Sequence, residues 1–127
     1  MISSLNSLAS MVFKNASASQ LSEIKKKFVE RIVTNFLDIM IMAHFTDRSF
    51  SGYDVLVFIQ KKFGLLLSPG TVYSKLYSME REGLIKLVVK RGRKRVYRVT
   101  DLGRLTVEVT TSTDEIRAFF SRIFERQ

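Results

Sequence analysis

The chain has 127 residues, which favours a single domain, and 46% of them are apolar, enough for a hydrophobic core. It has no cysteine and one histidine, which excludes disulfides and metal sites built from thiolates or several histidines. A formal net charge of +9 favours nucleic acid or an anionic surface as partner, and no apolar run is long enough to span a membrane. We therefore expect a cytoplasmic protein that needs no cofactor or metal.

The first 19 residues are serine-rich, with one lysine and no acid. They have neither the charged start nor the apolar run of a secretory signal. We expect residues 1–19 to form a poorly ordered arm. The alternative is a short helix that packs on a partner chain.

Residues from about Gln20 to Phe45 have a helical pattern, because apolar side chains recur at steps of three and four. The second half, from Phe36 onward, is apolar nearly all round apart from Asp38 and His44. A helix of this kind is buried on most of its sides.

Two further helices are predicted from their end signals. Ser51 and Asp54 fit a capping box at the start of the second helix, and Gly64 fits a left-handed cap at its end. Ser68 is a suitable N-cap for the third helix, and Pro69 at the first helical position costs no hydrogen bond. This helix is expected to run to Glu82, with Gly83 as its stop.

The third helix has two different faces. Its core stripe is Val72, Leu76 and Met79. The opposite face presents Gly70, Ser74, Tyr77, Ser78 and Arg81, with Thr71 and Lys75 on one flank and Tyr73 on the other.

A strongly basic β-hairpin follows. The run LIKLVVK, then RGRKR around Gly92, then VYRVT fits two antiparallel strands. Between Lys86 and Arg98 there are seven bases and no acid, so the rest of the chain carries only +2. A single-sign cluster repels itself unless an anionic partner offsets it, and phosphates are the natural partner.

Thr100 fits the cap of a last helix that starts at Asp101. The segment TVEVTTST is poor helix material, and Ser112 with Glu115 fits a second capping box, so a bend or restart is expected there. The end of the chain has one apolar stripe, formed by Ile116, Phe119, Phe120, Ile123 and Phe124.

Three helices, a hairpin and a final helix make the layout of a winged helix-turn-helix, a mainly α fold with a small β-hairpin. In such a fold the second helix of the pair enters the major groove and its N-terminal residues lie nearest the bases. The candidate recognition residues are Ser68, Gly70, Thr71, Tyr73, Ser74, Lys75 and Ser78. The candidate wing residues for DNA phosphates are Lys90, Arg91, Arg93, Lys94 and Arg95.

At these residues the chain resembles the PadR family of transcriptional regulators. The resemblance covers roughly Phe36 to Leu105 and rests on SPGTVY from Ser68, on EREGLI from Glu80, and on YRVT from Tyr97 followed by Gly103. Ser74 departs from the proline frequent in the family. The resemblance implies a dimeric winged-helix repressor of the small type, whose first and last helices form the dimer.

The resulting prediction is a homodimeric, sequence-specific regulator that binds double-stranded DNA. Residues 20–100 would form the DNA-binding domain and residues 101–127 the dimerisation helix. The dimer residues are expected to be Phe36, Met40, Ile116, Phe119, Phe120, Ile123 and Phe124, and a small apolar ligand could bind at their seam.

Two other functions remain open. A winged-helix protein–protein module within a larger nucleic-acid complex would use the last helix for a different partner, but the basic cluster argues against it. An enzyme such as a nuclease would need clustered carboxylates, whereas the twelve acids of the chain are scattered.

Overall fold

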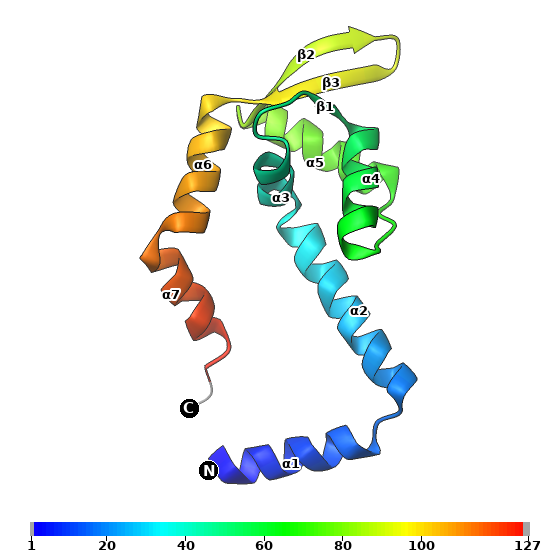
Figure 1. The fold of residues 1–127 in the computed structure, drawn as a ribbon, viewed down its shortest axis with the longest axis vertical. Helices are drawn as coiled ribbons and strands as arrows, with labels where there is room; N and C mark the ends of the chain where they lie inside the picture. Colours follow the sequence, from blue (N-terminus) through cyan, green and yellow to red (C-terminus); the bar gives the residue numbers. More distant parts are fainter. Residues whose placement is uncertain (1, 126–127) are drawn as a thin grey trace.

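The computed structural model describes the backbone of residues 2–125 and the side chains of residues 7–125. Its elements in chain order are α1 (Ile2–Asn15), α2 (Ala18–Asn35), α3 (Leu37–His44), β1 (Phe50–Ser51), α4 (Gly52–Phe63), α5 (Pro69–Arg81), β2 (Ile85–Arg91), β3 (Lys94–Val99), α6 (Asp101–Ser112) and α7 (Asp114–Ile123). Figure 1 shows a globular part made of α3, α4, α5 and the sheet. From it α2 and the α6–α7 pair extend away, and α1 lies crosswise beyond the far end of α2.

The predicted hairpin is present, and a third strand joins it. The sheet order is β1-β3-β2, all antiparallel. The short strand β1 was not predicted, because its two residues become a strand only by pairing with Tyr97 and Val96 of β3. The fold is therefore a mainly helical winged helix with a small three-stranded sheet, as expected from the order of elements.

The predicted ends of α4 and α5 are confirmed. Ser51 and Asp54 form the capping box, and Gly64 closes α4 with a left-handed φ of 67°. The Ser68 side chain accepts a hydrogen bond from the Thr71 amide, with Pro69 at the start of α5. These caps satisfy backbone groups that a helix end would otherwise leave without partners.

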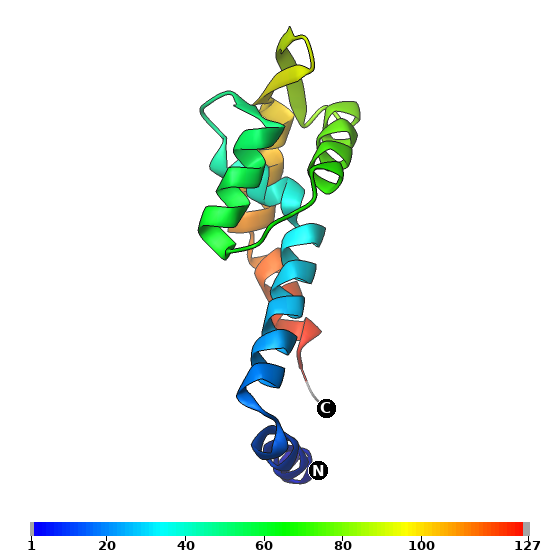
Figure 2. The same ribbon diagram turned by 90° about the vertical axis from the view of Figure 1, so that its right-hand side faces the viewer.

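One core joins the three helices to the sheet. Leu37 and Ile41 from α3, Val55 and Ile59 from α4, and the α5 stripe of Val72, Leu76 and Met79 are fully or almost fully buried. Tyr97 of β3 is also buried, with its ring 6.0 Å from that of Phe50. Figure 2 shows α4 and α5 on opposite sides of the globular part, beneath the hairpin.

The long helix predicted from Gln20 to Phe45 is divided at Phe36, which has φ −111° and ψ 21°. The backbone hydrogen bonds continue across this residue, since the Phe36 amide donates to the Ile32 carbonyl and the Phe36 carbonyl accepts from the Met40 amide. At the same place the Ile39 amide donates to the Asp38 carboxylate at 2.9 Å. A side chain that competes for a backbone amide is a known cause of helix distortion.

The last helix is interrupted at Thr113, where a bend or restart was expected, but the predicted capping box of Ser112 and Glu115 is wrong. Thr113 is the residue between α6 and α7, and its side chain does not cap α7. Its hydroxyl donates instead to the Val109 carbonyl at 2.8 Å, and Thr110 donates similarly to Thr106. Threonine hydroxyls that bond to the preceding turn bend helices, which accounts for the break.

Residues 2–15, for which the sequence left open either a poorly ordered arm or a short helix, form the helix α1. Leu8, Met11 and Val12 lie at helical spacing, and no proline or glycine interrupts them. Their side chains are 57%, 62% and 71% exposed.

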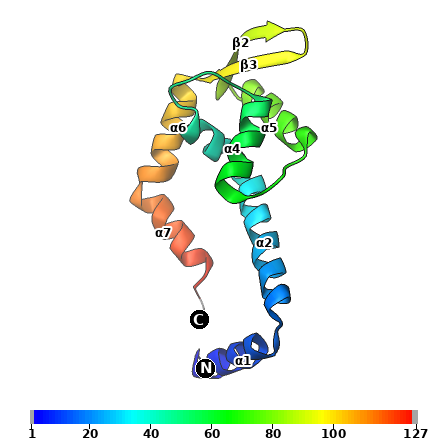
Figure 3. The ribbon, with the colours of Figure 1, turned by 45° about the vertical axis from the view of Figure 1, so that its right-hand side comes forward.

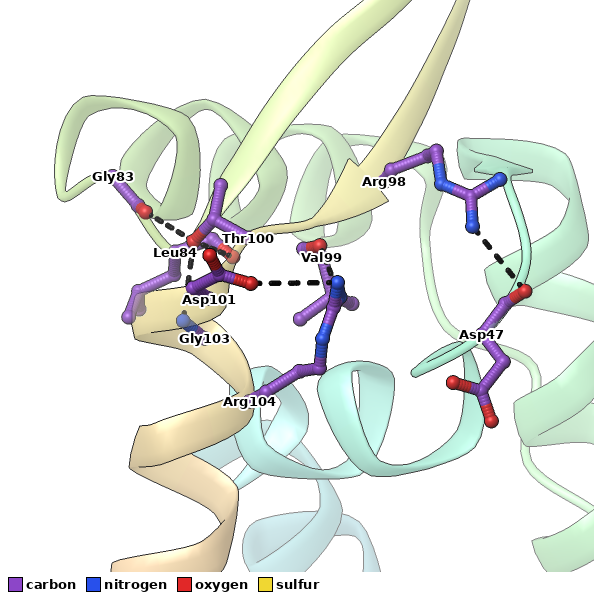
Figure 4. Close-up of polar contacts among 9 residues, drawn as sticks. All are labelled: Asp47, Gly83, Leu84, Arg98, Val99, Thr100, Asp101, Gly103 and Arg104. Atoms are coloured by element: carbon purple, nitrogen blue, oxygen red, sulfur yellow. Dashed lines mark hydrogen bonds and ion pairs between the residues drawn. The ribbon is translucent and has the colours of Figure 1, made fainter.

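Hydrogen bonds of the Thr100 side chain connect the end of β3 to the start of α6 and to the segment before β2 (Figure 4). Its hydroxyl lies 2.6 Å from the Gly83 carbonyl and 3.0 Å from the Leu84 carbonyl, and accepts from the Gly103 amide at 3.1 Å. Gly103 is buried, and a β-carbon there would collide with the Leu84 carbonyl oxygen. The start of α6 is therefore packed against the segment that leads into β2.

Candidate nucleic-acid interface

The two faces of α5 are separated as predicted. Val72, Leu76 and Met79 face the core, while Ser74 and Tyr77 are exposed on the opposite side. Figure 3 shows α5 beside α4 and below the hairpin. The exposed ring of Tyr77 on α5 lies 5.5 Å from the Arg95 Cζ of β3, so the outer face of α5 adjoins the hairpin.

The N-terminal turn of α5 combines a structural cap with a bare surface. The Ser68 hydroxyl is already bonded to Thr71. It accepts a hydrogen bond from the Thr71 amide at 3.1 Å, and it lies 2.8 Å from the Thr71 hydroxyl. Gly70 is exposed, and a β-carbon built there would come no nearer to another group than 4.0 Å, from the Ser68 hydroxyl. Packing within the chain therefore gives no reason for glycine at position 70.

Tyr73 has both a packing role and an exposed part. Its ring lies so close to Gly52, the first residue of α4, that a β-carbon on Gly52 would overlap the ring. The side chain is nevertheless 39% exposed. Tyr73 thus holds the N-terminal ends of α4 and α5 together while part of it remains at the surface. Lys75 and Ser78 are half-buried on the flanks of the helix.

The wing carries an exposed basic tip. Gly92 and Arg93 form the two-residue turn between the paired residues Arg91 and Lys94, and Gly92 has a φ of 59°. A glycine with positive φ at the first turn position suits the twist of a hairpin. The side chains of Lys90, Arg91, Arg93 and Lys94 are all exposed.

Arg95 differs from the other predicted wing residues, because it is held by the protein. Its Nη2 donates to both carboxylate oxygens of Glu80, at 3.0 and 3.3 Å, and its Nε donates to the Tyr97 hydroxyl at 2.8 Å. The hydrogen bonds with Tyr97 and Glu80 raise the pKa of Arg95 above its usual value. This ion pair was not predicted, because no local spacing rule connects residues 80 and 95.

The predicted dimer residues surround one apolar groove of about 1080 Å³. Phe36 and Met40 line one wall, and the α7 stripe lines the other. The rings of Phe36 and Phe120 meet edge to face at 5.7 Å. The structure therefore brings together Phe36, Met40, Ile116, Phe119, Phe120, Ile123 and Phe124. The sequence prediction missed further lining residues, among them Phe28, Ile32, Phe58 and Phe63.

His44 lies at the end of the groove near α4. Its ring stacks on Phe58 at 3.8 Å, and Arg48 donates to its Nε2 at 2.7 Å. Burial lowers the pKa of His44, and the positive charges of Arg48 and Lys62 lower it further. The neutral imidazole is the form that accepts a hydrogen bond from arginine.

The described part of the chain offers neither a metal site nor a membrane span. Among those residues, no three His, Cys, Asp or Glu side chains gather in a way that could hold a metal ion. No helix there is long and apolar enough to cross a membrane.

Similarity to known proteins places the chain in a family. The family model "Transcriptional regulator PadR-like family" matches residues 41–109, more than half of the chain. The transcriptional activator GvpE1 of Halobacterium salinarum is 31% identical over 91 residues, which are 71% of this chain and 47% of that protein. The chain thus spans about half the length of this curated relative.

Several solved structures have a similar fold, two bacterial regulators among them. A PadR family transcriptional regulator from Eggerthella lenta superposes with a TM-score of 0.64 at 18% identity, covering 87% of this chain and 100% of that one. A PadR-like regulator from Bacillus cereus gives a TM-score of 0.58 at 20% identity, covering 76% and 99%. At these identities the superpositions establish the fold.

Proposed function

Because the chain belongs to the PadR-like family of transcriptional regulators, we propose that it binds double-stranded DNA in a sequence-specific manner as a homodimer. The observation that carries this proposal is the wing, where Lys90, Arg91, Arg93 and Lys94 are exposed together. Such a cluster is stabilised by phosphates, which it binds with release of counterions. The family is one of regulators rather than enzymes, and it does not favour the alternative of a protein–protein module.

The two parts of the interface have different roles in this proposal. The wing cations bind backbone phosphates, which fixes position but does not read sequence. The first turns of α5 read base edges: Lys75 donates to guanine acceptors, and Ser74 bonds to base edges or phosphates. Gly70 lets the helix backbone approach the DNA, which explains a glycine that the fold itself does not require.

Dimerisation is supported by the apolar surface outside the core. Phe119 is 54% exposed and Phe124 is 70% exposed, although both belong to the groove between α2–α3 and α7. Apolar surface of this extent marks an interface in a protein that is soluble on its own. We place the partner protomer over this groove, with the two recognition helices about 34–36 Å apart or at a multiple of that spacing.

A small, flat apolar molecule is proposed as a ligand of the same seam. Met40 and the phenylalanine rings repack at modest cost, and the groove has room for a guest. The break at Thr113 would allow α7 to turn and change the angle between the two wings. A ligand acts in this way only if it binds the two arrangements with different affinity. Screening planar aromatic compounds by thermal shift and DNA release tests it: compounds that bind without changing DNA affinity contradict it.

The direction of regulation is proposed as repression, by occupation of promoter DNA. The halobacterial relative is named as an activator, so the opposite sign is the alternative for this chain. A reporter driven by a bound promoter decides between them, since repression requires expression to rise when this chain is removed.

The proposed function is tested by footprinting on the DNA that flanks the gene of this protein. The expected result is protection of two half-sites related by two-fold symmetry, each centred on a major groove. Uniform protection of all sequences, or none at low salt, would contradict a sequence-specific regulator.

A further inference from the structure

The hairpin beyond the core has few attachments to the rest of the domain. In β3, Tyr97 and Val99 are buried, while Lys94 is exposed. In β2, the residues from Val88 to Arg91 are exposed, and the register shifts between Leu87 and Val89. Such a bulge locally disrupts the ladder and bends the strand. The tip therefore projects past α5 (Figure 1), and its direction depends on the contacts at its base.

Arg95 makes the contact at this point. It is paired with Lys90 across the hairpin, on the tip side of the bulge. From there its guanidinium reaches Glu80 on α5 at 3.0 Å and the Tyr97 hydroxyl at 2.8 Å. Its Cζ also lies 5.5 Å from the ring centre of Tyr77, another α5 residue, and 5.7 Å from that of Tyr97.

The geometry is specific for arginine. The side chains of Arg95 and Glu80 are 22% and 31% exposed, so both are partly shielded by the protein. Arginine can donate from two nitrogens in one plane while stacking on a ring, whereas lysine offers one ammonium group. Donors already used for Glu80 and Tyr97 are not free for a phosphate.

We propose that Arg95 is a positioning residue that fixes the wing relative to the recognition helix, and that this fixed angle contributes to sequence discrimination. Wing phosphates and α5 base edges must be reached together, so a wing that turns freely loses register between the two contacts. Arg95 then does not bind phosphate, whereas the exposed wing residues do: Lys90, Arg91, Arg93 and Lys94. The proposal rests on the proposed DNA-binding function.

The first test uses three variants and two duplexes, the footprinted site and a scrambled site of equal length. Arg95→Lys keeps the charge but not the paired donors, and Glu80→Gln removes the carboxylate while keeping the shape. Both should lower the ratio of specific to scrambled affinity by about tenfold, the value of one base contact, with the salt slope unchanged. Arg93→Gln is the control, which should weaken both duplexes alike and reduce the slope by about one.

A phosphate-binding role for Arg95 predicts different results for the same variants. If Arg95 bound phosphate, Arg95→Lys would behave like the unchanged protein. Glu80→Gln would then strengthen binding to both duplexes by the same factor and leave the affinity ratio unchanged, because it removes a negative charge near the DNA and frees Arg95 for a phosphate of either duplex. Either result would overturn the positioning role.

A second measurement needs no DNA. Amide hydrogen exchange of the hairpin residues Val89 and Val96 should become faster in Arg95→Lys and Glu80→Gln, but not in Arg93→Gln. Unchanged exchange would overturn the proposal even if DNA binding were altered. If the unchanged protein showed no preference between the duplexes, the proposed function would fail, while the exchange data would still decide whether Arg95 holds the wing.

Discussion

Two glycines illustrate, at the scale of single residues, how packing and function can be separated. At Gly103 a β-carbon would meet the Leu84 carbonyl, and it would lie 2.7 Å from a Val99 methyl and 3.1 Å from the Met42 sulfur. At Gly70 it would meet nothing closer than 4.0 Å. Packing within the fold therefore requires a glycine at position 103, but it does not require one at position 70.

We therefore expect Gly103→Ala to lower the free energy of unfolding by about 1–3 kcal/mol, because a backbone carbonyl cannot move aside cheaply. Gly70→Ala should leave stability unchanged or raise it by about 0.4–1 kcal/mol through the unfolded state. Urea denaturation measures both. Gly70→Ala should nevertheless weaken binding to the preferred DNA site, and normal affinity in this variant would remove the argument for close backbone approach.

His44 gives the chain a defined pH dependence, since it is the single histidine. Its pKa is lowered in the folded state, so the unfolded chain binds more protons as the pH falls. The free energy of unfolding should therefore decrease as the pH falls below about 6.5, the usual pKa of histidine, until the folded pKa is passed. His44→Gln should have a flatter profile between pH 7.5 and 5.5 in chemical denaturation. An equal slope in both proteins would show that His44 is not the cause.

At the scale of elements, the sequence predicted helix ends better than helix continuity. Caps such as Ser51, Ser68 and Thr100 are local signals, and the structure has all three. The division at Phe36 and the two-residue strand β1 depend on tertiary contacts and on competing side-chain hydrogen bonds. The face of α5 was predictable from its period, whereas the contact of Arg95 with Glu80 joins two elements and leaves no periodic signal.

The wing and α5 should respond differently to substitution. Arg93→Ala and Lys94→Ala should weaken binding to every duplex and flatten the salt slope by about one unit each. Lys75→Ala and Ser74→Ala should cost roughly 1–3 kcal/mol on the preferred site alone. Fluorescence anisotropy on preferred and scrambled duplexes separates the two patterns. Wing variants that changed sequence preference while helix variants did not would reverse the assignment.

At the scale of the whole molecule, the apolar groove between α2–α3 and α7 is the surface on which the proposed dimer depends. Phe120 packs against Phe36 but is still 42% exposed, which is consistent with a second chain completing its surroundings. Phe120→Asp should dissociate the homodimer or unfold the chain, because dimerisation would bury a charge without a partner. Ser121→Asp, an exposed neighbour outside the groove lining, is the matched control. Sedimentation that shows a well-folded monomer of the unchanged protein at micromolar concentration would contradict the dimer.

The most direct test of the central claim is the salt dependence of DNA affinity, measured on the footprinted site and on a scrambled duplex. We expect the logarithm of the association constant to fall linearly with the logarithm of the salt concentration on both duplexes, because both meet the same wing cations. We also expect the footprinted site to be bound at least about 1,000-fold more tightly than the scrambled duplex at physiological salt. Equal affinity for the two duplexes, or an affinity that does not change with salt, would contradict a basic wing that positions a sequence-reading helix.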